Sequence, residues 1–432
     1  MAESDVLRVL LCGAVLGLYC WCLTIAVRAL YMRVTGRDRT GAASIPGAGA
    51  DMDRGSNIRL FLILLAIVFA GRMLQYLVGH ILCYGFDLSG FGLDSMRHLW
   101  VRSDAPHYLG IAEYGYRTVG DPRFHIVFFP LYPVLVGAAG VLTGDTFVAS
   151  LVVSNLSLAG ACFYLYKLAL MDTDAPGARR AVKYLLLFPV AFFLGAGFSE
   201  SLFLFLTAAA LYYARKDRFW LAALFAMAAA FTRMIGVLVA IPIVLEACEN
   251  CGMFDALREK RWKNVLRPFL KRALWALLVP LGTFAYLLVN KAVTGDWFTF
   301  LAYQRDHWYQ EFGLFFLNAG TIFGQLANGN EAANAFLWVP ELLCIILTLA
   351  LMVRMFRTQR LSYAFFALAY FLVAVAPTWL LSAPRYIMAM VPLYFMLQEI
   401  TRKRWADVLV TAAFAAAQLY MMWGFVNGMY IY

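Results

Sequence analysis

Charged residues are scarce in this chain. Asp, Glu, Lys and Arg make up 14% of its 432 residues, whereas 63% of the residues are hydrophobic. A soluble globular protein carries about 25% charged and about 45–50% apolar residues, because its core needs a hydrated surface. The charges present here are too few to coat a water-soluble core of this size. The composition therefore excludes an ordinary soluble enzyme and favours a protein surrounded by lipid.

Metal-binding patterns are scarce as well. Most of the eight cysteines lie inside apolar runs, where cysteine behaves as a small hydrophobic residue. Only Cys248 and Cys251 have CxxC spacing, and neither a second such pair nor a histidine cluster accompanies them. No acidic cluster requires a divalent cation. We therefore expect no metal site and no cofactor.

Long uncharged runs are the main feature that is present. They include Val9–Val27, Ile126–Gly144, Thr146–Tyr166, Ala273–Asn290, Leu361–Pro384 and Val408–Tyr432. Several approach the roughly 20 residues that a helix needs to cross a hydrocarbon layer of about 30 Å. Shorter runs such as Ser201–Ala214 either cross the membrane where it is thinned or form half-helices packed inside a bundle. The sequence predicts an all-α polytopic membrane protein, with residues 1–432 forming one bundle of about 11–13 transmembrane helices.

The first run, Val9–Val27, is predicted to remain as a membrane anchor. It exceeds the apolar core of about 7–15 residues of a signal peptide, and basic residues follow it. The segment Arg33–Arg59 is expected to be a linker to the second helix.

Basic residues give the chain a net charge of +10, and they cluster in short loops. One cluster lies within 258–272, a second at Arg354, Arg357 and Arg360, and a third within 402–404. Nucleic-acid binding is the weaker explanation, because this distribution is typical of the cytoplasmic loops of membrane proteins. Placing these loops inside puts two long loops, 85–125 and 292–335, outside. Segment 126–142 then cannot be a full crossing, and its prolines Pro130 and Pro133 disfavour a straight helix.

The densest polar motif runs from Trp100 to Tyr116 in the first external loop. Asp104 and His107 are three residues apart, so a helix would place them on one face. In one interpretation Asp104 caps a helix that begins near Pro106, and His107 is solvated. In the other, Asp104 is a general base at the membrane surface, shielded from water by aromatic side chains.

Three later ionisable residues stand between apolar runs. Glu200 and Arg233 either form a structural ion pair or face a polar cavity, since charges at membrane depth are unfavourable without a partner. Arg385 either extends to the lipid headgroups or binds a lipid-linked phosphate with its planar set of donors.

These motifs are spread from Trp100 to Tyr386, over most of the chain. They are Asp-Ala-x-His-Tyr at 104–108, Phe-Phe-Pro-Leu-Tyr-Pro at 128–133, Ser-Glu-Ser-Leu-Phe at 199–203, Thr-Arg-x-x-Gly at 232–236 and Arg-Tyr at 385–386. Together they resemble the PIG-V-like mannosyltransferases, a family of the GT-C class of membrane glycosyltransferases. Two positions depart from the family pattern: Ser103 stands where a tryptophan usually precedes the aspartate, and Met234 and Ile235 replace a polar pair.

The resemblance implies a GT-C-like fold with an external catalytic loop, 85–125. It implies a polyprenyl- or dolichyl-phosphate-mannose donor, a glycan or glycolipid acceptor, and inverting direct displacement on the outer or lumenal face. Asp104 takes the catalytic acidic position, and loop 292–335 is expected to hold the acceptor. Residues expected to bind substrate are Arg102, His107, Tyr108, Glu200, Arg233, Arg385 and Tyr386.

Two other classes of function remain open from the sequence. A transporter or a flippase of a lipid-linked sugar would share the substrate chemistry, but transporters show repeated halves with broken helices at the midplane. No such repeat is visible, and the polar motifs gather on one face. A non-catalytic scaffold is the other alternative. The expected location is a prokaryotic cell membrane with the site outside, or the endoplasmic reticulum membrane in a eukaryote.

Overall fold

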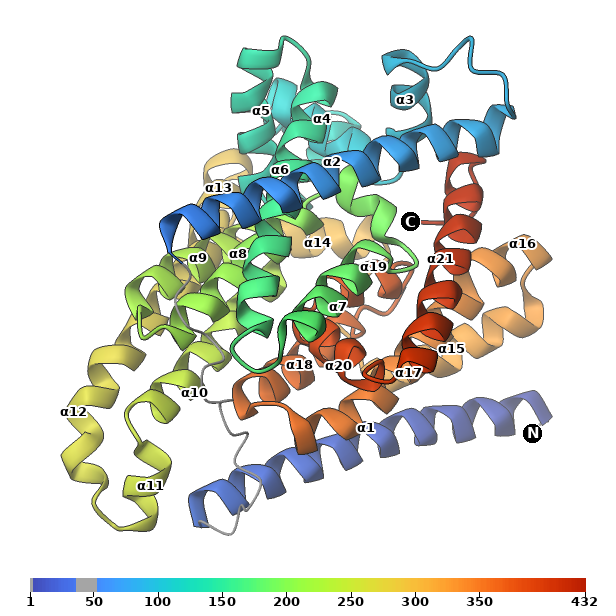
Figure 1. Cartoon of the computed structure of the whole chain (residues 1–432). Coiled ribbons are helices and arrows are strands. Elements are labelled where there is room, and N and C mark those ends of the chain that lie inside the picture. The colour runs from blue at the N-terminus through green and yellow to red at the C-terminus, as the bar shows by residue number, and fades with distance from the viewer. Residues whose placement is uncertain (1–2, 36–52) are drawn as a thin grey trace.

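The protein was analysed as a computed structural model that describes residues 3–35 and 53–432 (Figure 1). The central part of the predicted linker Arg33–Arg59, residues 36–52, lies outside the described residues. The described residues form helices, and the one extended pairing among them is an isolated bridge between Phe312 and Pro377.

The helices follow one another in the chain with short connections. The first third holds α1 (Glu3–Thr35), α2 (Arg54–Tyr84), α3 (Leu93–Trp100), α4 (Ala105–Tyr114), η1 (Asp121–Val127) and α5 (Leu131–Thr143). The middle holds α6 (Thr146–Ala169), α7 (Ala175–Leu186), η2 (Ala191–Gly195), α8 (Glu200–Arg215), α9 (Phe219–Thr232), η3 (Met234–Val239), α10 (Ala240–Asn250) and α11 (Met253–Arg258). Then come α12 (Trp262–Ala273), η4 (Leu274–Leu278), α13 (Val279–Thr294), α14 (Thr299–Asp306), α15 (Phe315–Asn328) and α16 (Glu331–Ala333). The last are η5 (Asn334–Trp338), α17 (Val339–Thr358), α18 (Leu361–Ala374), α19 (Ala383–Met388), α20 (Pro392–Ile400) and α21 (Arg404–Val426).

Six helical stretches among the described residues are long and apolar enough to cross a membrane. They are Val6–Thr35, Arg54–Tyr84, Thr146–Ala169, Trp262–Thr294, Glu331–Met355 and Arg404–Val426. These stretches confirm an all-α polytopic membrane protein. The expected total of about 11–13 crossings stays a prediction, because it requires short helices such as α9 and α18 to cross in a thinned or broken form.

Two apolar runs break where prolines occur. The axes of η1 and α5 meet at 116°, so segment 126–142 is bent, as Pro130 and Pro133 led us to expect. The run Leu361–Pro384 is not one helix, since α18 ends at Ala374 and the chain is irregular until α19. Pro377 lies in this break, where a missing N–H cannot support a helix.

The centre of the bundle is formed by α6, α8 and α9, which pack side by side. Most of α8 is buried on all sides, as expected for a helix in the middle of a bundle. In the view of Figure 1, α1 runs along the lower edge of the molecule and α2 crosses its upper half, and α1 packs against α15 and α17. The central helix α8 begins at Glu200 and thereby places that carboxylate inside the protein.

Candidate active site

Asp104 occupies the junction of α3 and α4, where the chain makes a tight turn. The preceding residue, Ser103, has a φ of +56°, a left-handed conformation that is uncommon for residues other than glycine. Asp104 stands at the N-cap position of α4, but its side chain makes no capping hydrogen bond. Its carboxylate instead forms an ion pair with Arg385 through Oδ2 and Nη2. The capping interpretation of Asp104 is therefore wrong.

A chain of four charged side chains crosses the site. Nε of Arg385 lies 3.0 Å from Oε1 of Glu200, and Nη1 of Arg233 donates to the same Oε1 at 2.7 Å. Arg385 bridges to Asp104 at the other end. Glu200 is 1% exposed, so two guanidinium groups compensate its buried negative charge. The order Asp104–Arg385–Glu200–Arg233 alternates in sign, and the four formal charges cancel.

Arg385 is buried and has contacts on several sides. It is 5% exposed, so the interpretation that it extends to the lipid headgroups is wrong. Both carboxylate oxygens of Glu341 accept from the N–H of Ala383, at 2.8 and 3.0 Å, and so cap α19, the helix that carries Arg385. Its guanidinium also lies over the rings of Phe198 and Phe193, with its central carbon 5.3 and 5.5 Å from their centroids.

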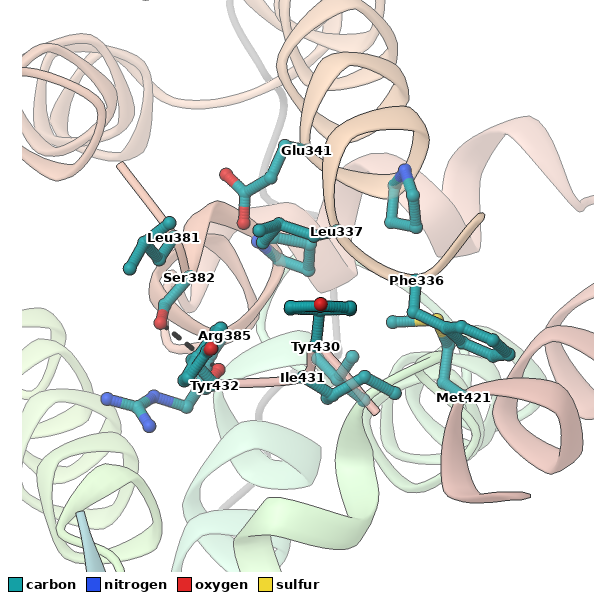
Figure 2. A pocket seen from close by; sticks show the side chains of 13 residues that line it. Phe336, Leu337, Glu341, Leu381, Ser382, Arg385, Met421, Tyr430, Ile431 and Tyr432 are labelled. Carbon is teal, nitrogen blue, oxygen red and sulfur yellow. Dashed lines mark hydrogen bonds between the residues drawn. The ribbon is translucent and has the colours of Figure 1, made fainter. Parts of the chain in front are cut away.

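Figure 2 shows a small cavity of about 10 Å³ beside this helix, with Glu341, Ser382, Arg385 and Tyr432 among the residues that line it. Ser382 donates to the main-chain oxygen of Tyr432 at 3.1 Å. Nη1 of Arg385 is buried and has no hydrogen-bond partner in the described part of the chain.

A larger cavity of about 250 Å³ lies against these charges. Polar side chains from distant segments face it, among them Gln304 and Gln310, whose amides hydrogen-bond to each other at 2.7 Å. Its walls are formed by Ser103, Asp104, Tyr108, Val127, Phe128, Phe129, Thr232, Arg233, Met234, Gln304, Trp308, Gln310, Leu381, Ser382, Arg385, Tyr386 and Tyr432. The cavity thus combines one carboxylate, two guanidinium groups and an aromatic wall.

His107 lies behind this aromatic wall. Its Nδ1 is 2.9 Å from Nε2 of His125, and its ring stacks on Phe128 and meets Trp308 edge-on. Burial lowers the pKa of His107 below its usual value of 6.5, although the charge of Asp104 acts in the opposite direction. His107 is therefore neutral at pH 7. It is packed against aromatic rings, so the interpretation in which Asp104 caps a helix and His107 is solvated is wrong for His107 as well.

The residues expected to bind substrate fall into three groups. Tyr108, Arg233, Arg385 and Tyr386 line the cavity together with Asp104. Glu200 lies behind the two arginines, and His107 lies behind Phe128. Arg102 points elsewhere: its Nε donates to the oxygen of Leu99 and its Nη1 lies close to Gly428.

Segment 292–335, the predicted acceptor loop, supplies Gln304, Trp308 and Gln310 to the wall of the cavity. His307 stacks on Phe124 instead, with ring centroids 3.8 Å apart, and Asp306 pairs with Arg305 at 2.7 Å.

Two site residues were not singled out from the sequence. Ser199 accepts from Arg233 at 3.2 Å and hydrogen-bonds Tyr108 at 2.9 Å. Glu341 is 1% exposed and is the one acidic residue in the apolar run 332–353, so it could have been found as an ionisable residue at membrane depth. Within residues 3–35 and 53–432, no group of three His, Cys, Asp or Glu side chains is placed to hold a metal ion.

No family model and no curated protein matches this sequence. Among solved structures, the fold is similar to the archaeal oligosaccharyltransferase AglB from Archaeoglobus fulgidus, solved in complex with an inhibitory peptide and a dolichol-phosphate. The identity is 12% and the TM-score 0.41, over 84% of this chain and 55% of that chain. The apo form of the Archaeoglobus fulgidus oligosaccharyltransferase matches with the same coverage and identity and a TM-score of 0.42. This chain thus spans about half the length of the oligosaccharyltransferases that it matches.

Proposed function

We propose that the chain is a membrane glycosyltransferase that moves a mannosyl residue from a polyprenyl-phosphate-mannose donor to a hydroxyl of a glycan or lipid-linked acceptor. The observation that carries the proposal is that Asp104, Arg233 and Arg385 face one cavity from three separate segments of the chain. A carboxylate can take a proton from an acceptor hydroxyl, and two arginines can stabilise a phosphate leaving group.

The reaction proceeds by direct displacement. The acceptor oxygen gives its proton to Asp104 and forms a bond to the anomeric carbon. The bond between that carbon and the phosphate oxygen breaks, and the phosphate leaves with the electron pair. Arg385 contacts Asp104 through Nη2 and also lines the cavity, so one positive charge acts on both the base and the leaving phosphate. Arg233 supplies the second positive charge.

Glu200 acts as a positioning residue rather than as a substrate contact. It does not line the cavity, and it is shared by Arg233 and Arg385. Its single buried carboxylate therefore sets the spacing between two groups that would otherwise repel each other. The choice of mannose as the donor sugar rests on the resemblance of the motifs at 104–108, 128–133 and 199–203 to those of the PIG-V-like family.

The aromatic wall fits a sugar. Tyr108, Phe128, Trp308 and Tyr386 present ring faces and edges to the cavity, and the amides of Gln304 and Gln310 lie among them. Sugars offer an apolar C–H face and a rim of hydroxyls, and such a mixed wall matches both.

A transfer assay in detergent tests the proposal. The purified chain receives short-chain polyprenyl-phosphate-mannose labelled in the sugar, together with a membrane-lipid or glycan extract. Label in a new product and release of polyprenyl phosphate in equal amount are expected. A flippase needs two leaflets and releases no polyprenyl phosphate in detergent, so intact donor with every extract would favour the flippase, transporter or scaffold instead.

A further inference from the structure

The chain turns back on itself after α14 and brings two glutamine side chains to the candidate active site. Tyr309 has a φ of +54°, and this left-handed turn lets the N–H of Gln310 donate to the main-chain oxygen of Gln304 at 3.0 Å. The two side-chain amides also meet, because Nε2 of Gln304 donates to Oε1 of Gln310 at 2.7 Å. Both glutamines line the same cavity as Asp104 and Arg385. The cavity therefore contains two neutral amides in addition to its charged groups.

The segment after this turn is fixed to the irregular stretch between α18 and α19. The N–H of Thr378 donates to the main-chain oxygen of Glu311 at 2.9 Å, and the N–H of Gly313 donates to the oxygen of Ala376 at 3.0 Å. Gly313 permits this close approach, since a Cβ there would lie 2.7 Å from Cγ2 of Thr378. The stretch before α19 thus holds the two amides in place relative to Arg385, which α19 carries.

A main-chain carbonyl decides which way each amide is turned. Nε2 of Gln310 donates to the main-chain oxygen of Trp379 at 2.8 Å, and that oxygen can only accept. Oε1 of Gln310 therefore faces Gln304, which must present its Nε2 in return. Oε1 of Gln304 then has no partner among the described residues, and it stays accessible on a half-buried side chain. This chain of hydrogen bonds from Trp379 through Gln310 to Gln304, called here the amide relay, leaves one oriented acceptor at the cavity.

An oriented acceptor distinguishes a hydroxyl from other substituents. A hydroxyl group can donate to Oε1 of Gln304, whereas a hydrogen atom bonded to carbon in its place cannot. A site that bonds a hydroxyl rejects an analogue without it, because the polar atom of the site then loses its partner. The donor sugar is the group to be recognised here, since it is bonded directly to the phosphate proposed for Arg233 and Arg385, and both arginines line the same cavity.

We propose that Gln304 determines specificity for the donor sugar by accepting a hydrogen bond from one of its hydroxyls. Gln310 is a positioning residue, which acts through Gln304 by fixing the orientation of its amide. This role rests on the proposed function, because its ligand is the polyprenyl-phosphate-mannose named there. The aromatic wall accepts any sugar with an apolar face, whereas the amide relay selects for a hydroxyl at one position of the ring.

Binding of donor analogues to the purified full chain in detergent tests this role without requiring transfer. The ligands are short-chain polyprenyl-phosphate-mannose and the analogues that each lack one sugar hydroxyl, all with the same phosphodiester charge. Isothermal titration calorimetry without an acceptor gives the Kd of each ligand. The variants are Gln304→Leu and Gln310→Leu, and the control is Gln325→Leu, at a half-buried glutamine of α15 that does not line the cavity. The thermal midpoint of each ligand-free variant establishes that it folds.

We expect one deoxy analogue to bind the wild type about tenfold more weakly than the mannosyl lipid, and Gln325→Leu should keep this difference. In Gln304→Leu the same two ligands should bind equally, because the partner of the missing hydroxyl is gone, while the differences for the other analogues stay. Gln310→Leu should reduce the difference to about threefold or less, since the amide of Gln304 can then turn.

Three outcomes separate this role from the transfer reaction. Differences between ligands that are identical in wild type and Gln304→Leu would overturn the role of Gln304, even in a protein that transfers mannose. A difference that Gln304→Leu abolishes, in a protein that forms no product, would support this role and contradict the proposed transfer. Failure of the wild type to bind any mannosyl lipid would overturn both.

Discussion

Arg385 binds Asp104 across 281 positions of the chain, and this ion pair joins the turn between α3 and α4 to the C-terminal helices at the candidate active site. The guanidinium is almost fully buried, whereas the carboxylate side chain is 22% exposed and lines the cavity. The arginine is thus the fixed partner, and Asp104 is the group that can meet a substrate.

Replacing Arg385 by Lys should reduce transfer strongly even though the charge is kept. An ammonium group cannot contact Asp104, Glu200 and a phosphate at the same time, because it lacks the planar set of donors. We expect kcat to fall about 10²-fold or more, the size typical for loss of one transition-state donor. Steady-state transfer kinetics measure it, with Arg354→Lys on the 63% exposed partner of Glu399 as the control. Activity of Arg385→Lys equal to that of wild type would rule out this role.

Replacing Glu200 by Gln should show whether this carboxylate positions Arg233 and Arg385 without itself contacting the substrate. The two arginines lose their shared counter-ion, so Arg233 and Arg385 are expected to repel and to bind the donor phosphate less well. The KM for the donor should rise about tenfold or more, an effect that a purely structural role would not produce in the folded fraction. The matched control is Glu249→Gln, which removes a carboxylate paired with Arg33 at 2.9 Å far from the cavity. An unchanged donor KM in folded Glu200→Gln would contradict the positioning role.

Substitutions at Ser103, in the turn before Asp104, should change stability in opposite directions for glycine and for a β-branched residue. With φ at +56°, Ser103→Gly removes the steric cost of the left-handed conformation, whereas Ser103→Val increases it. We expect the glycine variant to keep or raise the thermal midpoint and the valine variant to lose about 1–2 kcal/mol of stability together with activity. A valine variant as stable and active as the glycine variant would show that the turn does not constrain Asp104.

The pair His107–His125 should make the fold sensitive to acid. Burial lowers the pKa of His107 in the folded protein, so below about pH 6.5 the unfolded chain binds more protons than the folded one. Stability is therefore expected to be constant above that pH and to fall as the pH drops towards 5. Thermal unfolding at pH 7.5 and 5.5 measures the effect, and the loss should be smaller in His107→Gln. An equal loss in His107→Gln would assign the acid sensitivity to other groups.

The long apolar runs were sufficient to predict several helices and the membrane environment. Thr146–Tyr166 and Val408–Tyr432 correspond to α6 and α21, because an uncharged run of this length has few alternatives to a buried or lipid-facing helix. The bend at Pro130 and Pro133 also followed from local chemistry. The break after Ala374 did not, because Pro377 was read within one continuous run.

The candidate site could be predicted only in part, because its contacts join segments far apart in the chain. The motif containing Asp104 and the lone Arg385 stood out against apolar surroundings. Nothing in their spacing indicated that they touch, or that Glu341 caps the helix carrying Arg385. The pairing of Glu200 with Arg233 and a polar cavity beside them were given as alternatives, but the structure has both. Arg102 was expected to bind substrate, but its Nε donates to the main-chain oxygen of Leu99 and it does not line the cavity.

The most direct test of the central claim is the rate of mannosyl transfer from polyprenyl-phosphate-mannose by wild type, Asp104→Asn and Asp255→Asn. Asp255 lies on α11 and its side chain is 47% exposed, so its substitution controls for the loss of one carboxylate. We predict equal transfer by wild type and Asp255→Asn, and a loss of about 10²–10⁴-fold in Asp104→Asn, as for removal of a general base. Transfer by Asp104→Asn at the wild-type rate would contradict the assignment of Asp104 as the base.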